Sequence, residues 1–340
     1  MSKNKQHLSS PLSEFDLIER FFKRSSSLQE GNNGIILGIG DDCALLELGS
    51  SEVIAASIDS LVSGVHFFAD EKPFNIGYKA VMVNASDLAA MGAKPRWLTL
   101  ALTLPEMDEN WLSLFSQGLF QALAETGMSL VGGDTTRGPL SLSVQVQGSV
   151  DKDKALRRSG MQEGDVIYVS GPLGGAALGL AYRLGKIQFN NDDQKEKILE
   201  LIEQALCLPQ ARWQLGLILK DYANSCIDIS DGLAADLTHM LRQSACGAKI
   251  NLTDIPYHLA FSSVNLSLNE KWQYALAGGE DYELCFSMNK NNEEKLLEKL
   301  KSKNINIFRI GEVISGDDKN LNFYLGRDEI KLNLSGYRHF

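Results

Sequence analysis

Strict alternation of apolar and polar residues in two segments constrains the fold of this chain more than any other feature. The segments are residues 97–104 and 140–147, and their inward positions are Leu98, Leu100, Leu102 and Leu104 in the first and Leu140, Leu142, Val144 and Val146 in the second. A period of two is that of a half-buried β-strand. Adjacent strands of this kind favour antiparallel or mixed sheets over a doubly wound parallel sheet.

Helical periodicity is interleaved with these strands in both halves of the chain. Residues 73–95 predict a helix that opens near Pro73 and closes at Gly92, and residues 109–126 predict another. A charged segment, DKDKALRRSG, follows Val150 and predicts a domain boundary. We therefore expect an α/β (α+β) fold with mixed or antiparallel sheets flanked by helices, divided into domains 1–150 and 151–340. A chain of 340 residues is long enough for two hydrophobic cores.

Composition excludes several classes of protein. The net charge of −10 argues against sequence-independent binding of nucleic acid, which needs a basic face. No run approaches the roughly 18 apolar residues of a membrane span, and the N-terminal MSKNKQHLSS lacks the apolar core of a signal peptide. The five cysteines are scattered, with no Cys-x-x-Cys pair, which fits a reducing compartment. We expect a cytoplasmic protein without nucleic-acid or membrane partners.

Six places in the chain set carboxylates among apolar or glycine-rich residues, where a free charge is costly. These places are Asp41–Asp42, Asp59, Asp87, Asp134, the pair Asp228 and Asp231, and the pair Glu280 and Asp281. Each has a structural alternative: Asp59 and Asp134 can cap turns, and Asp231 can cap its own helix. Asp87 interrupts an almost apolar helix, where its alternative is a cap to a neighbouring loop. Strand ends that converge on one cleft would explain all six places together.

Carboxylates gathered in one cleft repel each other unless cations lie between them. Oxygen ligands without a His or Cys cluster indicate Mg²⁺ rather than zinc. Multi-carboxylate Mg²⁺ sites most often handle phosphates, because the metal bridges protein and phosphoryl oxygens. The chain has no P-loop and no protein-kinase motif set, and Cys43 stands where a dinucleotide fingerprint needs its third glycine. The sequence therefore predicts a phosphate-handling Mg²⁺ site on another fold.

Nucleophilic catalysis has little support in the sequence. There is no Gly-x-Ser-x-Gly motif, and the five histidines are spread along the chain. His66 follows Asp59 on the segment LVSGVHF, where it either lines a ligand site or packs against the protein.

Seven motifs follow one another along the chain: GIGDDCALL, Ser57-Ile58-Asp59 with Gly64-Val65-His66-Phe67, VNASDLAAMGAKP, LVGGDTTRGPL, ALRRSG, IDISDGLAADL and GGEDYELCF. In sequence and in order they resemble the motifs of the thiamine-monophosphate kinases, which belong to the aminoimidazole ribonucleotide synthetase superfamily. The similarity runs from about residue 14 to the C-terminal GYRHF, nearly the whole chain. The resemblance implies the two-domain fold of that superfamily.

The resemblance also implies an activity. ATP would phosphorylate thiamine monophosphate directly, giving thiamine diphosphate and ADP, the final step of thiamine diphosphate synthesis. Several Mg²⁺ ions would assist, with no covalent enzyme intermediate. The resemblance further implies a homodimer whose N-terminal domains pair their sheets.

Matching motif positions carries the family's site residues onto this sequence. The metal-binding set is Asp42, Ser57, Ile58, Asp59, Asp87, Asp134, Asp228 and Asp231. Of these, Asp42, Asp87 and Asp228 would clamp the metals at the reacting phosphates, while Asp41 would shape its turn. The ATP contacts are Gly133, Asp134, Arg158 and Ser230. The thiamine part would be held by His66, Glu280 and Tyr337, with Glu280 facing the cationic heterocycle and Tyr337 stacking on it.

The family pattern supports two of these assignments less well than the others. Ile58 stands where the family often has Thr, so a metal contact there can use only the main-chain carbonyl. The loop that carries Tyr337 has little sequence constraint.

Two other functions are compatible with the same motifs. One is another ATP-using enzyme of the superfamily, of the hydrogenase-maturation, selenophosphate-synthetase or purine-synthetase type. Hydrogenase-maturation relatives end in a reactive cysteine, whereas this chain ends Arg-His-Phe. The other reading is a metal or nucleotide sensor that binds ATP without turnover.

Overall fold

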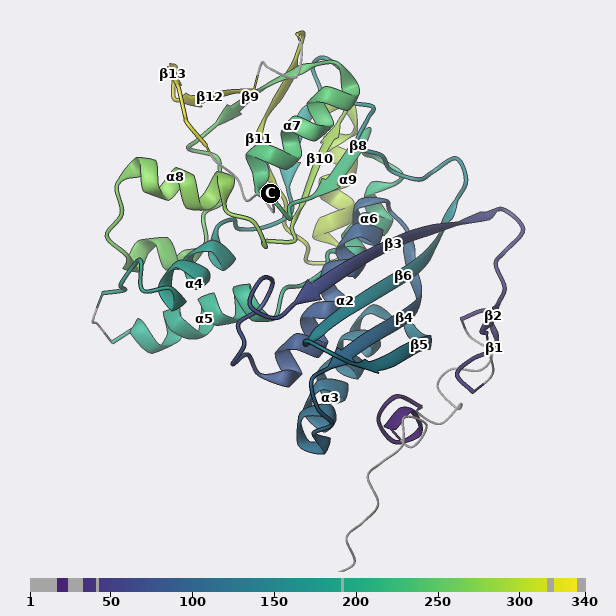
Figure 1. Cartoon of the computed structure of the whole chain (residues 1–340). Helices are drawn as coiled ribbons and strands as arrows, with labels where there is room; N and C mark the ends of the chain where they lie inside the picture. The colour runs from purple at the N-terminus through teal and green to yellow at the C-terminus, as the bar shows by residue number, and fades with distance from the viewer. Residues whose placement is uncertain (1–16, 24–32, 41–42, 191–192, 317–320, 335–340) are drawn as a thin grey trace, which may run out of the picture.

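The computed structural model describes residues 17–23, 33–40, 43–190, 193–316 and 321–334, and Figure 1 shows their arrangement. Two large sheets form, one from each half of the chain, with helices packed against them. A short two-stranded sheet, β1 (Ile35–Leu37) and β2 (Leu45–Leu46), precedes them, as does the π-helical turn η1 (Ile18–Phe22). The expected mixed α/β class is confirmed.

The N-terminal sheet has four strands in the order β3-β6-β4-β5. The strands are β3 (Glu52–Val62), β4 (Lys94–Leu104), β5 (Ser129–Arg137) and β6 (Ser141–Asp151). Only β4 and β5 pair in parallel; the other pairs are antiparallel. The two alternating segments of the sequence became β4 and β6, which lie side by side and turn their apolar residues to the same face.

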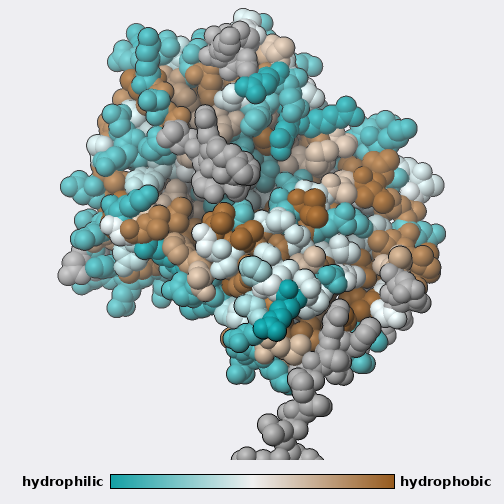
Figure 2. Space-filling view, viewed as in Figure 1, coloured by the Kyte–Doolittle hydropathy of each residue, from teal (hydrophilic) through white to brown (hydrophobic). Residues whose placement is uncertain are grey.

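Two helices cover that apolar face, α2 (Pro73–Ala90) and α3 (Glu109–Thr126). In Figure 1 the sheet lies in front of α2 and α3, and no other described element covers its near face. Figure 2, in the same view, shows pale, weakly polar residues there with brown apolar ones between them. The sheet therefore has one packed face and one open face.

Helix α2 lies between the N-terminal sheet and the C-terminal half of the chain. From position 76 to position 90 every residue is buried except Asp87, which is partly accessible. A helix that is apolar on all sides is one that is surrounded by protein. Asp87 therefore marks the one point at which this stretch of α2 reaches solvent.

The C-terminal sheet has seven strands in the order β13-β12-β9-β11-β7-β10-β8. All neighbours are antiparallel except β12 and β9. The strands are β7 (Val166–Val169), β8 (Ser225–Asp228), β9 (Gly247–Asn251), β10 (Leu284–Met288), β11 (Phe308–Ile314), β12 (Leu321–Leu325) and β13 (Asp328–Ile330). The expected mixture of antiparallel and mixed sheets is confirmed in both halves.

Six α-helices accompany this sheet in the described residues. They are α4 (Gly175–Arg183), α5 (Lys195–Cys207), α6 (Trp213–Leu219), α7 (Leu233–Ser244), α8 (Leu268–Ala277) and α9 (Glu293–Lys301), joined by the short turns η3 (Leu259–Ser263) and η4 (Lys290–Asn292). None of the helices within the described ranges is long and apolar enough to cross a membrane.

Two expectations about strand ends were wrong. Asp59 was expected to end its strand, but β3 continues to Val62 and Asp59 pairs with Val144 inside the ladder. Asp134 was expected at a turn, but β5 continues to Arg137. In both cases polar residues continue a strand whose neighbours supply the hydrogen bonds, which local hydrophobicity does not reveal.

A glycine contact fixes how the C-terminal half sits on α2. Gly216 of α6 packs against Ala89 so closely that a Cβ at position 216 would lie 2.2 Å from the Ala89 carbonyl oxygen. Ala89 is two residues beyond Asp87, so this contact sets the distance between the Asp87 region and the C-terminal half.

We predict that Gly216→Ala lowers the free energy of unfolding by about 1–3 kcal/mol through overpacking. A decrease in the free energy of unfolding would be informative, because alanine in a helix interior is otherwise favoured over glycine by about 1 kcal/mol. Urea titration would measure the change, with Gln214→Ala, an exposed position of the same helix, as the control. A Gly216→Ala protein as stable as the Gln214→Ala protein would contradict the prediction.

Candidate active site

The candidate site begins where β3 meets α2. The Ser57 hydroxyl donates to Asp87 Oδ2 at 2.5 Å. The Asp59 backbone N–H donates to Asn84 Oδ1 at 3.1 Å, and Asn84 is buried on α2 one turn before Asp87. Asp59 and Ser57 alternate with Ile58 along β3, so both point to the helix-covered face. Two expected metal ligands, Asp59 and Asp87, therefore come from adjacent elements of one wall.

The second wall comes from the C-terminal half. Asp228, the last residue of β8, is buried, and its Oδ2 accepts a hydrogen bond from Ser86 Oγ of α2 at 2.9 Å. The Arg158 guanidinium acts electrostatically on both Asp87 and Asp228, so it lies close to the two carboxylates. Asp87 and Asp228, which are 141 residues apart in the sequence, thus meet at the interface between the halves.

The burial and crowding of these carboxyl groups raise their pKa values. Burial raises the pKa of Asp228 to about 7, and the charge of Asp87 adds to the shift. Burial also raises the pKa of Asp87, although the Ser57 hydrogen bond and Arg158 oppose it. For Asp59, loss of hydration followed by repulsion from Asp87 and Glu280 raises the pKa to about 6. Carboxyls that hold protons this tightly lack a nearby positive charge sufficient for all of them.

The turn between β8 and α7 presents Ser230 and Asp231. Their backbone N–H groups both donate to Asp236 Oδ2, each at 3.1 Å, so a buried carboxylate from α7 holds the turn from behind. Burial and the charge of Asp228 raise the pKa of Asp236 to about 7. Asp231 is exposed, and its side chain stands free of this hydrogen bond. The turn is therefore rigid while its outer carboxylate faces solvent.

The GGEDYE segment is joined to that turn. Glu280 N–H donates to the Ser230 carbonyl at 2.8 Å, and Tyr282 N–H donates to the Ile229 carbonyl at 2.9 Å. A Cβ at Gly279 would lie 2.3 Å from the Ser230 carbonyl oxygen, which explains the glycine there. Glu280 and Tyr282 both have left-handed backbone conformations, at φ 73° and 50°. Such non-glycine strain persists only where the surroundings enforce it, and it is concentrated at functional sites.

Strand pairing places other expected residues on the far side of the N-terminal sheet. Asp134 lies in one row with Ala101, Ser143 and Ser60, on the open face, whereas Asp59 points to the opposite, helix-covered face. Asp134 is also three strand spacings of about 4.8 Å from β3, about 14 Å in all. Gly133 lies on the same strand, β5. Within one chain, Gly133 and Asp134 are therefore not brought to the Asp87–Asp228 pair.

Four further expected site residues have different outcomes. Ile58 is 62% exposed on the open face, so its side chain has no part in the carboxylate cluster. His66 Nδ1 accepts a hydrogen bond from Val62 N–H at 3.0 Å, which holds the ring over its own turn. Asp42 and Tyr337 lie outside the described residues.

Sequence reasoning missed two buried ionisable residues beside the site. Asp236 could have been identified from the sequence, since it is an acidic residue in the first turn of a helix directly after IDISDG. The sequence contains almost no indication that Lys79 is buried, because a lysine on a helix is usually exposed. The structure buries Lys79 and pairs its Nζ with Glu280 Oε2.

The donor set suits a hard divalent cation. Asp59, Asp87 and Asp228 offer only carboxylate oxygens, the ligands Mg²⁺ takes. Within the described parts of the chain, however, no three His, Cys, Asp or Glu side chains stand close enough together to hold a metal ion. Asp87, which is partly accessible, and the buried Asp228, both with raised pKa values, fit a cation-binding wall to which further ligands must be added.

Comparison with known proteins shows the family of this chain. Residues 40–150 match the family model of the AIR synthase related protein N-terminal domain, and residues 162–323 match that of its C-terminal domain. Thiamine-monophosphate kinase of Escherichia coli K12 is 44% identical over 327 residues, 96% of this chain and 98% of its own length. The chain belongs to the thiamine-monophosphate kinase family. The Bacillus subtilis enzyme is 29% identical over 97% of this chain and 100% of its own.

Solved structures of the family share the fold. Thiamine-monophosphate kinase from Stenotrophomonas maltophilia superposes with a TM-score of 0.82 at 39% identity, covering 94% of this chain and 98% of its own. The AaThiL complex with AMPPCP and TMP has a TM-score of 0.71 at 28% identity, covering 98% and 100%. Hydrogenase maturation protein HypE of E. coli also reaches 0.71, but at 20% identity it shows the fold alone.

The raised pKa values predict that stability falls as pH rises when no divalent metal is present. A carboxyl whose pKa is higher in the folded protein stabilises the fold below its ordinary value and loses that contribution as pH passes the folded value. For Asp228 this window runs from 3.8 to about 7. We expect the melting temperature in EDTA to fall across the window, and to fall less in Asp228→Asn.

Thermal unfolding followed by circular dichroism at a series of pH values would measure this effect. Asp70→Asn, at an exposed position, is the control and should keep the wild-type slope. If Asp228→Asn and the wild type lose stability in parallel across the window, the carboxyl is not protonated in the metal-free fold and the prediction is wrong.

Proposed function

We propose that this chain phosphorylates thiamine monophosphate to thiamine diphosphate with ATP, by direct in-line transfer assisted by Mg²⁺. The observation that carries the proposal is the meeting of Asp87 and Asp228 across the two halves, in a chain of the thiamine-monophosphate kinase family. The AaThiL complex with an ATP analogue and TMP supports both substrates.

The proposed metal ligands are the side chains of Asp42, Asp59, Asp87, Asp134, Asp228 and Asp231, with Ser57 and the Ile58 carbonyl. Mg²⁺ bound there would neutralise phosphoryl oxygens as charge shifts during transfer. The chain's own contribution is to hold the carboxylates rigidly. Ser57 and Ser86 fix Asp87 and Asp228 by hydrogen bonds at 2.5 and 2.9 Å.

Substrate contacts complete the proposal. Gly133, Asp134, Arg158 and Ser230 would bind ATP, and Arg158 is the cation already placed beside Asp87 and Asp228. His66, Glu280 and Tyr337 would hold the thiamine part. The acceptor phosphate oxygen is already a nucleophile at neutral pH, so alignment, rather than a strong general base, is what the protein must supply.

We also propose a homodimer formed through the N-terminal sheets. β3 and β5 are the two edges of the four-stranded order. An unpaired edge strand invites pairing with another chain. On the open face, β3 exposes Ile54 by 55%, Ile58 by 62% and Val62 by 37%. A two-fold dimer that pairs β3 of one copy with β5 of the other would remove both edges and cover these apolar residues.

Such a dimer would also supply the distant ligands. With β5 of a second copy beside β3, Asp134 of that copy would lie about one strand spacing, near 5 Å, from the strand that carries Ile58 and Asp59. Gly133 and Asp134 of the other subunit would then lie beside each site, with the Asp134 side chain on the Ile58 side of β3, opposite to the Asp59 side chain.

Two remaining parts of the proposal concern organisation. We place the domain boundary after Val150, between the matched N-terminal and C-terminal family models. We also place the protein in the cytoplasm, where its five free cysteines, four of them buried, remain thiols.

A coupled assay for ADP tests the function. The wild type with Mg²⁺ and ATP should form ADP when thiamine monophosphate is added, and not with thiamine or aminoimidazole precursors. Asp87→Asn should abolish turnover while keeping the circular dichroism spectrum. ADP formation by Asp87→Asn near the wild-type rate at saturating Mg²⁺ would overturn the role of Asp87, and ATP binding without turnover in the wild type would indicate a sensor.

Mixed dimers test the shared site. Asp59→Asn and Asp134→Asn should each be inactive alone. If Asp134 serves the other subunit's site, refolding the two variants together regenerates one intact site per mixed dimer, about a quarter of all sites after random pairing. If both residues serve one subunit's site, mixing restores nothing. Co-purification with two affinity tags would confirm that mixed dimers formed.

A further inference from the structure

Lys79 is a buried cation on α2 that belongs to none of the motifs described above. Its side chain is only 7% exposed. Buried lysines are rare unless they are paired. Lys79 Nζ has two partners, both from the C-terminal half: Glu280 Oε2, and the Leu206 carbonyl oxygen at 3.1 Å.

The Glu280 carboxylate is held from two sides. Lys79 binds Oε2, and the Tyr282 hydroxyl donates to Oε1 at 3.0 Å. Glu280 nevertheless keeps 33% of its side chain exposed, so a ligand can reach it. Each carboxylate oxygen has two acceptor positions. One position on each oxygen therefore remains for a ligand's donors.

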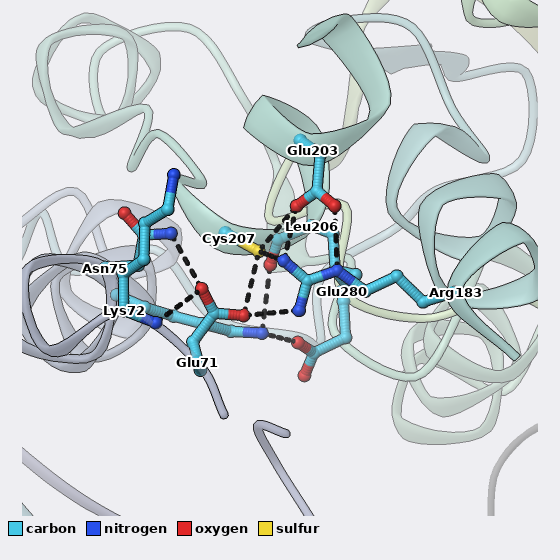
Figure 3. Close-up of polar contacts among 9 residues, drawn as sticks. Glu71, Lys72, Asn75, Arg183, Glu203, Leu206, Cys207 and Glu280 are labelled. Atoms are coloured by element: carbon cyan, nitrogen blue, oxygen red, sulfur yellow. Dashed lines mark hydrogen bonds and ion pairs between the residues drawn. The ribbon is translucent and has the colours of Figure 1, made fainter. Parts of the chain in front are cut away.

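The other anchor of Lys79 is rigid. Leu206 is in the last turn of α5, where carbonyls lack partners within the helix and the helix dipole favours a cation. Figure 3 shows the ion pairs that hold this end of α5. Arg183 of α4 binds Glu203 of α5 at 2.5 Å and Glu71, just before α2, at 2.6 Å. The lysine ammonium is thus fixed relative to both halves of the chain.

The backbone alone does not fix the Glu280 carboxylate. The left-handed turn sets its Cα, but several side-chain torsions lie between Cα and the carboxylate. Glu280 also acts electrostatically on Asp59, so a freely rotating carboxylate would be driven from the neighbouring acidic cluster. The ion pair with Lys79 restricts the rotation of the Glu280 carboxylate and offsets its negative charge.

We propose that Lys79 is a positioning residue for Glu280, which it orients so that the free acceptor positions recognise the N–H donors of the acceptor substrate's aminopyrimidine ring rather than its cationic ring, which has none. This inference rests on the proposed function, in which Glu280 binds the thiamine part of thiamine monophosphate. Lys79 itself touches no substrate. Acceptor binding in the C-terminal half thereby depends on a side chain of the N-terminal half.

A different role predicts different behaviour. If Lys79 only ties the two halves together, its loss should disturb ATP and acceptor alike. If Lys79 acts through Glu280, its loss should weaken acceptor binding selectively, and it should have no further effect once Glu280 is changed.

Steady-state kinetics separate the two roles. For Lys79→Met we expect KM for thiamine monophosphate to rise on the order of 10- to 100-fold, as is typical when a partner behind a ligand group is removed. We expect kcat and KM for ATP to stay within about threefold, because uniform binding is what is lost. Lys72→Met, an exposed lysine at the start of α2, is the matched control, and Lys79→Arg should largely restore KM.

A double-mutant cycle with Glu280→Gln gives the decisive comparison. KM for thiamine monophosphate in the double variant should equal that of Glu280→Gln alone. The positioning role would be overturned if the fold-increases in KM of the two single variants multiply in the double variant. It would also be overturned if Lys79→Met raises KM for ATP as much as KM for thiamine monophosphate. Should Lys79→Met fail to fold by thermal unfolding, Lys79→Gln, which keeps an N–H donor, takes its place in the cycle.

The same data distinguish failure of the inference from failure of the proposed function. A wild type that forms no ADP from thiamine monophosphate refutes the function. A normal KM in Glu280→Gln refutes the acceptor role of Glu280 and the inference with it. A raised KM in Glu280→Gln together with a normal KM in Lys79→Met refutes the inference alone.

Discussion

The structure depends on burying α2 between two sheets. Helix α2 is surrounded from position 76 to position 90, so every ionisable group on it must find a partner or a cation. Lys79 pairs with Glu280, whereas Asp87 accepts a hydrogen bond from Ser57 and is stabilised by the charge of Arg158. Since these partners come from both halves of the chain, the contact that forms the core also assembles the candidate site.

The acidic wall of the site carries more negative charge than the neighbouring cations offset. Asp228 and Asp236 have pKa values raised to about 7, because each is shielded from water and faces another carboxylate. The pKa of the more exposed Asp59 is raised to about 6 by partial loss of hydration and by repulsion from Asp87 and Glu280. A serine hydroxyl orients the Asp228 carboxylate and two backbone N–H groups orient that of Asp236, in each case without neutralising the charge. A rigid, underneutralised acidic wall is suited to divalent metals that carry phosphate, which is the chemistry that we propose for this chain.

Local patterns in the sequence predicted two helices and two strands of the N-terminal half. Residues 109–126 became α3 at those positions, and the alternating segments became β4 and β6. The errors fell where polar residues continue a strand, at Asp59 and Asp134, because ladder hydrogen bonds there come from neighbours that are distant in sequence. Lys79 escaped notice for a related reason: nothing next to it in sequence indicates that Leu206 and Glu280 will surround it.

By itself the sequence determined the fold class, the abundance of carboxylates in apolar settings and hence the expectation of a hard cation and a phosphate. These follow from side-chain chemistry and from periodicities of two and 3.6 residues, which are local properties. Only the tertiary structure decided which carboxylates meet. Packing of α2 against β8 placed Asp87 beside Asp228, and strand register turned Asp134 to the other face of its sheet, because contacts between distant segments are set by packing of the whole chain rather than by any single stretch of it.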